Sequence, residues 1–150
     1  MLHIFEGPSG SGKTTYIQGI FLQKKPDAIF YTRQYGKGTE PHDPNFRLGV
    51  FRALCDLSKD RDIVIDRMHF SEAYFGKVLR GYNFDWQEFE QWLRDNHVEV
   101  LLHFMRTPWG VCHQRYVQRG GREVMNFSAA EEYGFMQECW ALSELPKVAI

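Results

Sequence analysis

A glycine-rich run near the amino terminus joins an apolar segment to a helix-forming one. The pattern G-x-x-x-x-G-K-[ST] is matched by Gly7-Pro8-Ser9-Gly10-Ser11-Gly12-Lys13-Thr14, directly after the apolar run Leu2-His3-Ile4-Phe5. A strand that ends in glycines and then opens a helix lets successive backbone N–H groups curl around phosphate oxygens, and the helix dipole favours the same negative charge. The run therefore predicts a site for ATP with Mg²⁺.

The residues of this loop have separate expected roles. Lys13 is expected to reach the β- and γ-phosphates, and the hydroxyl of Thr14 to join the Mg²⁺ shell. Glycines allow positive φ angles and close backbone approach, where a Cβ atom would collide with phosphate oxygens. The cofactor-binding residues that we expect are Gly7, Pro8, Ser9, Gly10, Ser11, Gly12, Lys13, Thr14 and Thr15, with Arg115 from later in the chain.

Size, charge and cysteine content exclude several classes of protein. The 150 residues fit a single domain, 1–150, with a sizeable core. The formal net charge of −1 argues against a surface that binds nucleic acid or anionic membranes throughout, so a nucleic-acid partner is not favoured. The cysteines, Cys55, Cys112 and Cys139, are expected to be reduced buried thiols. Since no apolar run is long enough to span a membrane, we expect a cytoplasmic protein without a membrane partner, compatible with a homodimer.

Apolar periodicity predicts strands that alternate with helices. The expected strands are 2–6, 28–33, 62–66, 98–104 and 147–150, and the expected helices are 13–23, 46–58, 70–79, 85–94, 108–119 and 128–142. Asp85 and Ser128 are expected to cap two of these helices. The order predicts an α/β fold of the P-loop NTPase type, with three layers and a mainly parallel five-stranded sheet. Ligands are expected at the carboxyl ends of its strands.

A second group of polar residues begins where the apolar strand around residues 63–65 ends. Asp66 at this end of the sheet is expected to hold Mg²⁺ through its water shell or to orient an acceptor. The adjoining Arg67 is expected to clamp phosphate with its forked guanidinium group. Without the phosphate loop, a helix-capping Asp beside a solvated Arg would be the simpler interpretation.

A third group is basic. Arg115 and Arg119 are four residues apart on one helical face, and Arg122 follows Gly120-Gly121. Glycines beside arginines suit a closing lid, because the hinge absorbs backbone rotation while guanidinium groups arrive over the phosphates. We expect a short arginine-rich lid at about 115–127.

The residues resemble the thymidylate kinase-like and deoxynucleoside kinase-like group of the P-loop kinases, the nucleoside monophosphate kinase branch. The resemblance is carried by three groups of residues. They are the opening Phe5-Glu6-Gly7 with Gly10 and Gly12-Lys13-Thr14-Thr15; the acceptor-side residues Arg33, followed by Gly36, Asp66-Arg67, Ser71 and Arg80-Gly81; and the lid from Cys112-His113-Gln114-Arg115 through Arg119, Arg122 and Glu123. The resemblance implies a nucleotide kinase fold and an acceptor-side loop at about 33–45.

The chain also departs from thymidylate kinases. Their phosphate loop contains an acidic residue, whereas Pro8 and Ser9 stand at the matching positions here. Their Arg-x-Pro-Gly-Gly loop lacks its proline here. The resemblance therefore does not imply a preference for thymine, and the acceptor geometry is expected to differ.

Acid–base chemistry helps to choose the acceptor. A hydroxyl stays protonated at neutral pH and gains from a positioned carboxylate, whereas a monophosphate is already ionised and needs mainly charge neutralisation. Deoxynucleoside kinases place a glutamate just after the second strand, where this chain has Thr32-Arg33-Gln34-Tyr35. A monophosphate acceptor is therefore favoured. Because Asp66 or Glu72 could act as a base, a deoxynucleoside, or a hydroxyl on a modified or polymeric nucleotide, remains the alternative.

The sequence thus predicts a P-loop nucleotide kinase that transfers the γ-phosphoryl group of ATP to a thymidylate-like deoxynucleoside monophosphate. The expected catalytic residues are Lys13, Asp66, Arg67, Arg119 and Arg122; the acceptor-binding residues are Arg33, Tyr35, Arg67, Phe70 and Tyr74; the Mg²⁺ ligands are Thr14 and Asp66. Core packing is the alternative role for the three aromatic residues among them. A non-catalytic nucleotide-binding module or an ATPase is a further alternative for the whole chain.

Overall fold

The computed structural model describes residues 1–32, 43–120 and 128–150. Its sheet has the strand order β2-β3-β1-β4-β5, and every strand pair is parallel. The strands are β1 (Leu2–Glu6), β2 (Ile29–Thr32), β3 (Ile63–Asp66), β4 (Val100–Phe104) and β5 (Lys147–Ala149). The predicted five-stranded parallel sheet is confirmed, and it places the phosphate loop after the central strand.

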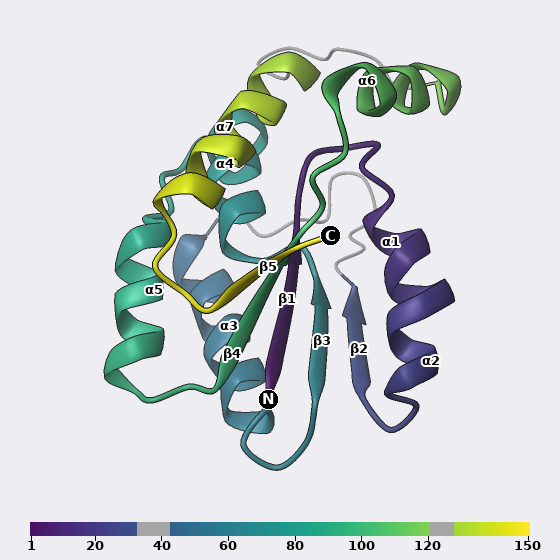
Figure 1. Ribbon diagram of the computed structural model, residues 1–150. Coiled ribbons are helices and arrows are strands. Elements are labelled where there is room, and N and C mark those ends of the chain that lie inside the picture. The colour runs from purple at the N-terminus through teal and green to yellow at the C-terminus, as the bar shows by residue number, and fades with distance from the viewer. Residues whose placement is uncertain (33–42, 121–127) are drawn as a thin grey trace.

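Helices cover both faces of this sheet (Figure 1). One face carries the first helical stretch, which consists of α1 (Lys13–Tyr16), the π-helical η1 (Ile17–Phe21) and α2 (Leu22–Lys24). The other face carries α3 (Pro44–Leu57), α4 (His69–Arg80), α5 (Trp86–Asp95) and α7 (Ala129–Leu142), while α6 (Trp109–Gln118) lies beyond the carboxyl ends of the strands. The predicted three-layer α/β arrangement is confirmed.

Local capping explains where several helices begin. The Asp85 carboxylate accepts a hydrogen bond from the Glu88 N–H at 3.0 Å, and the Ser128 hydroxyl accepts one from the Glu131 N–H at 3.4 Å, as predicted. The prediction placed the start of α3 two residues too late, because it missed the Asp43 cap. Pro108 also lies one position earlier than predicted, at the cap of α6 instead of in its first turn.

The central strands are buried on both faces, as parallel strands between two helix layers should be. In β1 and β3, Leu2, Ile4, Ile63 and Ile65 belong to the larger core. The alternate residues, including Phe5 and Val64, pack against the first helical stretch. The three cysteines are buried and free, as predicted. Within the described residues, every helix is too short or too polar to cross a bilayer.

Two buried histidines lie between neighbouring strands near the first helical stretch. Nδ1 of His3 is 3.1 Å from Nε2 of His103, and the His103 ring stacks on Phe5 with centroids 4.2 Å apart. Burial lowers the pKa of both imidazoles, and in His103, where the proximity of His3 adds to the effect, the pKa falls to about 4. The fold therefore favours neutral imidazoles at this position, as expected for core histidines.

This pair should make the fold sensitive to acid. Because the pKa of His103 is lower in the folded than in the unfolded chain, its contribution to stability is complete above about pH 6.5 and is lost as the pH falls towards about 4. The loss should be on the order of 3 kcal/mol. Urea unfolding at a series of pH values should show a flatter acid slope for His103→Leu than for the unchanged protein, whereas the exposed-site variant His113→Gln should keep the slope. An identical slope in His103→Leu would contradict this assignment.

Candidate active site

The phosphate loop follows β1 and is pressed against α6. Gly10 and Gly12 have φ angles of 79° and 90°, which disfavour residues with a side chain. A Cβ atom on Gly10 would lie 2.3 Å from the carbonyl oxygen of Cys112 in α6. Only glycine fits at position 10, because both its backbone conformation and the adjacent helix exclude a side chain.

The Lys13 side chain folds back along the loop. Its ammonium group donates hydrogen bonds to the carbonyl oxygens of Gly7 at 2.7 Å and Pro8 at 3.0 Å, and to the Ser11 hydroxyl at 3.2 Å. The side chain is nearly buried. Burial and, secondarily, the nearby Arg67 guanidinium lower the pKa of Lys13 to about 7. A phosphate anion at the loop would favour the charged ammonium.

The structure brings Thr14 and Asp66 together from α1 and the end of β3. The Thr14 hydroxyl donates a hydrogen bond to Oδ2 of Asp66. The other carboxylate oxygen, Oδ1, is buried and has no hydrogen-bond partner among the described residues. A hydroxyl beside a carboxylate with an unsatisfied oxygen fits a Mg²⁺ ion that keeps several of its waters. The described residues contain no cluster of three or more His, Cys, Asp or Glu side chains suited to a metal.

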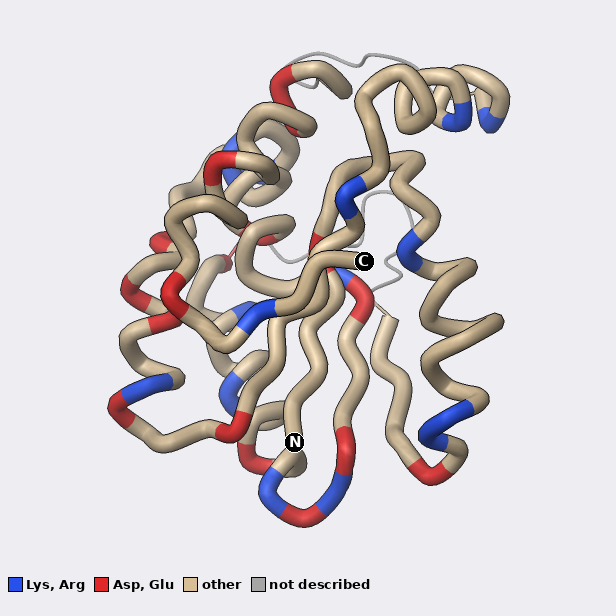
Figure 2. The backbone as a smooth tube through the Cα atoms, viewed as in Figure 1, with Lys and Arg blue, Asp and Glu red and all other residues tan. Residues whose placement is uncertain are grey.

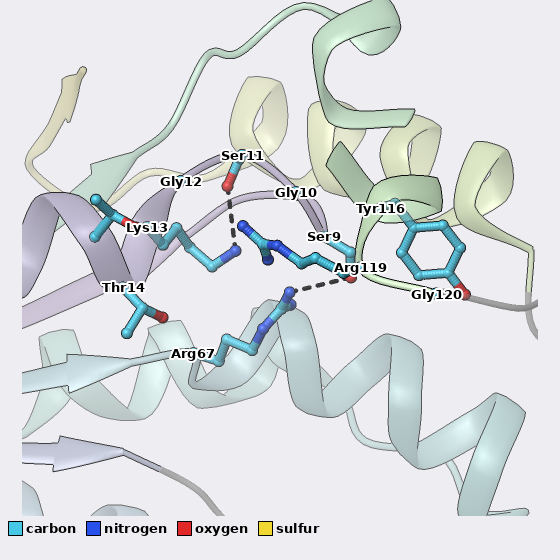
Figure 3. Close-up of a pocket in the computed structure, with 11 residues that line it drawn as sticks. Ser9, Gly10, Ser11, Gly12, Lys13, Thr14, Arg67, Tyr116, Arg119 and Gly120 are labelled. Carbon is cyan, nitrogen blue, oxygen red and sulfur yellow. Dashed lines mark hydrogen bonds between the residues drawn. The ribbon is translucent and has the colours of Figure 1, made fainter. Parts of the chain in front are cut away.

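Arg67 points into the same region from the β3–α4 junction (Figure 3). Its backbone has a φ of 72°, a strained conformation for a residue other than glycine. Nη1 donates to the Ser71 hydroxyl at 3.2 Å, and Nη2 donates to the Ser9 hydroxyl at 3.3 Å. The guanidinium also lies over the Phe75 ring, 5.3 Å from its centroid. Its orientation is therefore held by several contacts.

Glu6, the last residue of β1, fixes the start of α4. Its Oε1 accepts hydrogen bonds from the backbone N–H groups of Met68, Phe70 and Ser71 at 2.8, 3.0 and 3.2 Å, and its Oε2 accepts the Ser71 hydroxyl at 2.6 Å. The side chain is fully buried. In the sequence, Glu6 stands out only as a member of the opening motif Phe5-Glu6-Gly7. Its carboxylate satisfies helix N–H groups that would otherwise lack partners.

Glu132 of α7 is a site residue that sequence analysis missed. Its fully buried carboxylate accepts hydrogen bonds from the backbone N–H and, at 2.8 Å, the hydroxyl of Ser9. The loop position that is acidic in thymidylate kinases is thus approached here by an acid from another helix. One signal was available: Glu132 shares the helical spacing of Ala129, Met136 and Cys139, and so places a charge within an apolar stripe.

The basic end of α6 lies beside the loop. Figure 2 shows basic but no acidic positions along α6 and its carboxyl end, and in the sequence the basic residues there are Arg115 and Arg119. Nη1 of Arg115 donates to the Gly10 carbonyl at 3.4 Å. Arg119, Tyr116 and Arg67 line a cavity of about 380 Å³ with the loop residues Ser9 to Thr15. A second cavity of about 620 Å³ adjoins it and is lined by Tyr16, Ile20, Met105, Thr107, Arg115 and Arg119.

Two predicted base-contacting aromatics lie in the core instead. Phe70 has no exposed surface and packs edge to face on Trp86, with centroids 5.0 Å apart. Tyr74 is 7% exposed, and its hydroxyl donates to the Ser128 carbonyl at 3.0 Å. Neither ring offers a face to a ligand in this structure, because both sit on the buried side of α4. Core packing, the alternative role, accounts for both.

Glu72, one of the two acids considered as a base, is also buried. Its Oε1 accepts hydrogen bonds from Arg80 Nη2 at 2.9 Å and from the Tyr82 hydroxyl, while Oε2 lies 3.7 Å from Nε of Arg47. Two arginines thus lie against this carboxylate, which has no exposed surface. Glu72 is therefore placed to join α3 to α4, and of the two acids considered as a base, Asp66 is the one that contacts a residue of the cavity, Thr14.

Three predicted site residues, Arg33, Tyr35 and Arg122, lie outside the described residues, as do positions 33–42 of the acceptor-side loop and 121–127 of the lid.

Comparisons with known proteins place this geometry in a structural group. No protein-family model matches the chain, and a search of curated proteins finds no match. Among solved structures, all of the chain is covered by the YorR protein from Bacillus subtilis, solved with phosphorylated GDP, at 16% identity, 85% coverage of that chain and a TM-score of 0.72. This chain has the fold of the P-loop nucleotide kinases.

Deoxyadenosine kinase from M. mycoides is also similar. Its structure with bound dATP matches all of this chain at 16% identity, with 90% of that kinase covered and a TM-score of 0.60. Its structure with the products dCMP and dCDP matches at the same identity and coverage, with a TM-score of 0.58. At these low identities the similarity shows the fold alone.

Removing the Glu6 carboxylate should destabilise the fold. Glu6→Ala leaves three buried N–H groups without their acceptor, so the free energy of unfolding should fall by about 3 kcal/mol or more. Urea unfolding measures this change, with Glu138→Ala as a control because that glutamate is exposed on α7. Equal stability of Glu6→Ala and Glu138→Ala would show that Glu6 does not anchor α4.

Proposed function

We propose that the protein is an ATP-dependent phosphotransferase that moves the γ-phosphoryl group of ATP to a deoxynucleoside monophosphate. One observation carries this proposal: Lys13, Arg67 and Arg119 line a single cavity with the phosphate loop. Phosphoryl transfer needs positioning and charge stabilisation more than covalent chemistry, and this cavity offers converging cations and loop N–H groups.

The donor side consists of the loop, Thr14 and Asp66. The loop N–H groups and Lys13 bind the ATP phosphates, and the adjoining 620 Å³ cavity offers room for the rest of the nucleotide. Thr14 and Asp66 would hold a Mg²⁺ ion, which neutralises charge on the phosphates when bound. Arg119 approaches from α6 and stabilises the transferred group.

The acceptor side centres on Arg67. A guanidinium group binds phosphate through paired hydrogen bonds, which suits an acceptor that is already ionised. The sequence supports three further roles. Arg33 would clamp the acceptor phosphate, Tyr35 would stack on the acceptor base, and Arg122 would act as a lid residue. We propose a thymidylate-like acceptor base, and the panel of nucleoside monophosphates described below identifies the base that is preferred.

A second candidate function is phosphorylation of a deoxynucleoside or of another hydroxyl. It is favoured by the fold shared with a protein described as deoxyadenosine kinase and by the position of Asp66 beside the loop. In that case Asp66 would accept the proton of the attacking hydroxyl instead of acting mainly on Mg²⁺.

Lys13 should make nucleotide binding depend on pH. Since the pKa of its ammonium is about 7 before a phosphate charge acts on it, binding of Mg-ATP at pH 8 to 9 should take up most of a proton, and affinity should fall as the pH rises above about 7. Calorimetry in two buffers of different ionisation enthalpy measures the uptake. Lys13→Arg, which stays protonated, should bind without it. A dissociation constant that is unchanged from pH 7 to 9 would exclude this role of Lys13.

The function itself is tested by ADP formation from Mg-ATP with a panel of nucleosides, nucleoside monophosphates and short single-stranded DNAs. Stimulation by one monophosphate supports the proposal. Lys13→Ala should lose at least about 100-fold of that activity, because the electrostatic stabilisation of the phosphates is removed. The matched control Lys77→Ala removes an exposed lysine of α4 and should remain active.

The other outcomes of the panel separate the alternatives. Stimulation only by a nucleoside or by DNA would replace the monophosphate proposal with a hydroxyl acceptor. ADP formation that no acceptor changes would indicate an ATPase, and binding of ATP without ADP formation would indicate a nucleotide-binding module. Full activity of Lys13→Ala would contradict the donor-site assignment.

A further inference from the structure

A closed group of contacts joins three separate parts of the chain beside the cavity. Ser9 belongs to the phosphate loop, Arg67 to the β3–α4 junction and Glu132 to α7. The Ser9 hydroxyl accepts a hydrogen bond from Nη2 of Arg67 at 3.3 Å and donates one to Oε2 of Glu132 at 2.8 Å. Nη2 of Arg67 also lies 3.8 Å from Oε1 of Glu132. The hydroxyl therefore bridges a cation and an anion (Figure 3 shows its contact with Arg67).

The carboxylate of Glu132 is fully buried, whereas the Arg67 side chain is 25% exposed. Burying a carboxylate is costly unless hydrogen bonds and an opposite charge compensate. Here the compensation comes from Ser9, through its N–H and hydroxyl groups, and from Arg67. Arg67 therefore contacts Ser9 and Glu132 with one part of its guanidinium group and still contributes to the lining of the cavity.

The Glu132 carboxylate also affects the binding of an anion to Arg67. A negative charge a few ångströms from the guanidinium lowers its net attraction for phosphate, and the interaction is strong where water is excluded. The contact also limits the rotation of the guanidinium, which reduces the entropy lost when an acceptor is oriented. One residue is thus expected to improve orientation while it weakens binding.

We propose that Glu132 is a positioning residue for Arg67: acting directly and through Ser9, its charge holds the guanidinium in one orientation and lowers the affinity of the site for phosphate. The proposal rests on the proposed phosphotransferase function for its kinetic part. Its binding part depends only on the geometry of Ser9, Arg67 and Glu132.

Glu132→Gln is the decisive variant, because the amide keeps the shape of the side chain and removes its charge. Glu131→Gln is the matched control, since that neighbour is exposed on the same helix turn. The first readout is binding of inorganic phosphate in saturating Mg-ADP, measured by calorimetry. Glu132→Gln should bind phosphate about tenfold more tightly, as expected for the removal of one nearby competing charge. The gain should disappear when Arg67→Ala is added.

The second readout is kinetic and uses the acceptor found in the panel. Glu132→Gln should lower kcat about tenfold, because the Arg67 clamp loses the charged contact that restricts its guanidinium and keeps only those to Ser9, Ser71 and Phe75, while KM for an anionic acceptor stays level or falls. Glu131→Gln should match the unchanged protein in both readouts. A purely structural role would instead lower the melting temperature alone.

The two readouts keep failure of the inference distinct from failure of the proposed function. If no acceptor is phosphorylated, the phosphate-binding readout still decides: tighter binding that requires Arg67 supports the inference, and unchanged binding overturns it. Unchanged kcat and phosphate affinity in a folded Glu132→Gln protein would also overturn it.

Ser9→Ala provides the test if Glu132→Gln does not fold. This variant removes the bridging hydroxyl but keeps the backbone hydrogen bond from residue 9 to Glu132. Because about 1 kcal/mol of hydrogen bonding is lost, Ser9→Ala should lower kcat at least threefold. If no acceptor is found, the Arg67-dependent affinity for phosphate should change by a similar factor. No change in either quantity would overturn the inference.

Discussion

The hydrogen bonds that Glu6 accepts from the start of α4 are the contact on which the rest of the site depends. They tie the end of the central strand to the β3–α4 junction, so that the phosphate loop and Arg67 are held beside each other. Arg67 has a strained backbone, which such a network can stabilise, because Glu6 satisfies N–H groups on the next turn and the Phe5 carbonyl accepts the Arg67 N–H at 2.9 Å. The buried Glu6 carboxylate thus helps to hold the partly exposed Arg67 in position.

Much of the fold could be predicted because its signals are local. The glycine-rich loop after an apolar strand, the alternation of strands with helices and the Asp85 and Ser128 caps depend on neighbouring residues only. The pairing of Thr14 with Asp66 could also be expected, since the carboxyl ends of parallel strands share one edge of the sheet. The local pattern of the phosphate loop, together with the rule that parallel strands end at one edge of the sheet, was sufficient to predict this pair.

The remaining features depend on tertiary packing. Whether the rings of Phe70 and Tyr74 face a ligand or the core is decided by the rotation of α4, which the spacing of aromatic residues does not fix. Glu132 is more than a hundred residues from Ser9 in sequence, and their contact exists only because α7 lies next to α4 and α6. The π-helical segment η1 within the first helical stretch also interrupts the regular α-helical periodicity that predicted a helix there.

The close approach of Gly10 to the Cys112 carbonyl has a mechanical consequence. With no room for even a methyl group between them, the phosphate loop cannot move towards the amino-terminal half of α6 unless that helix moves as well. A ligand that pushes the loop towards α6 therefore also shifts the base of the arginine-bearing helix. Through this contact, the occupancy of the donor pocket is coupled to the position of the helix that carries Arg115 and Arg119.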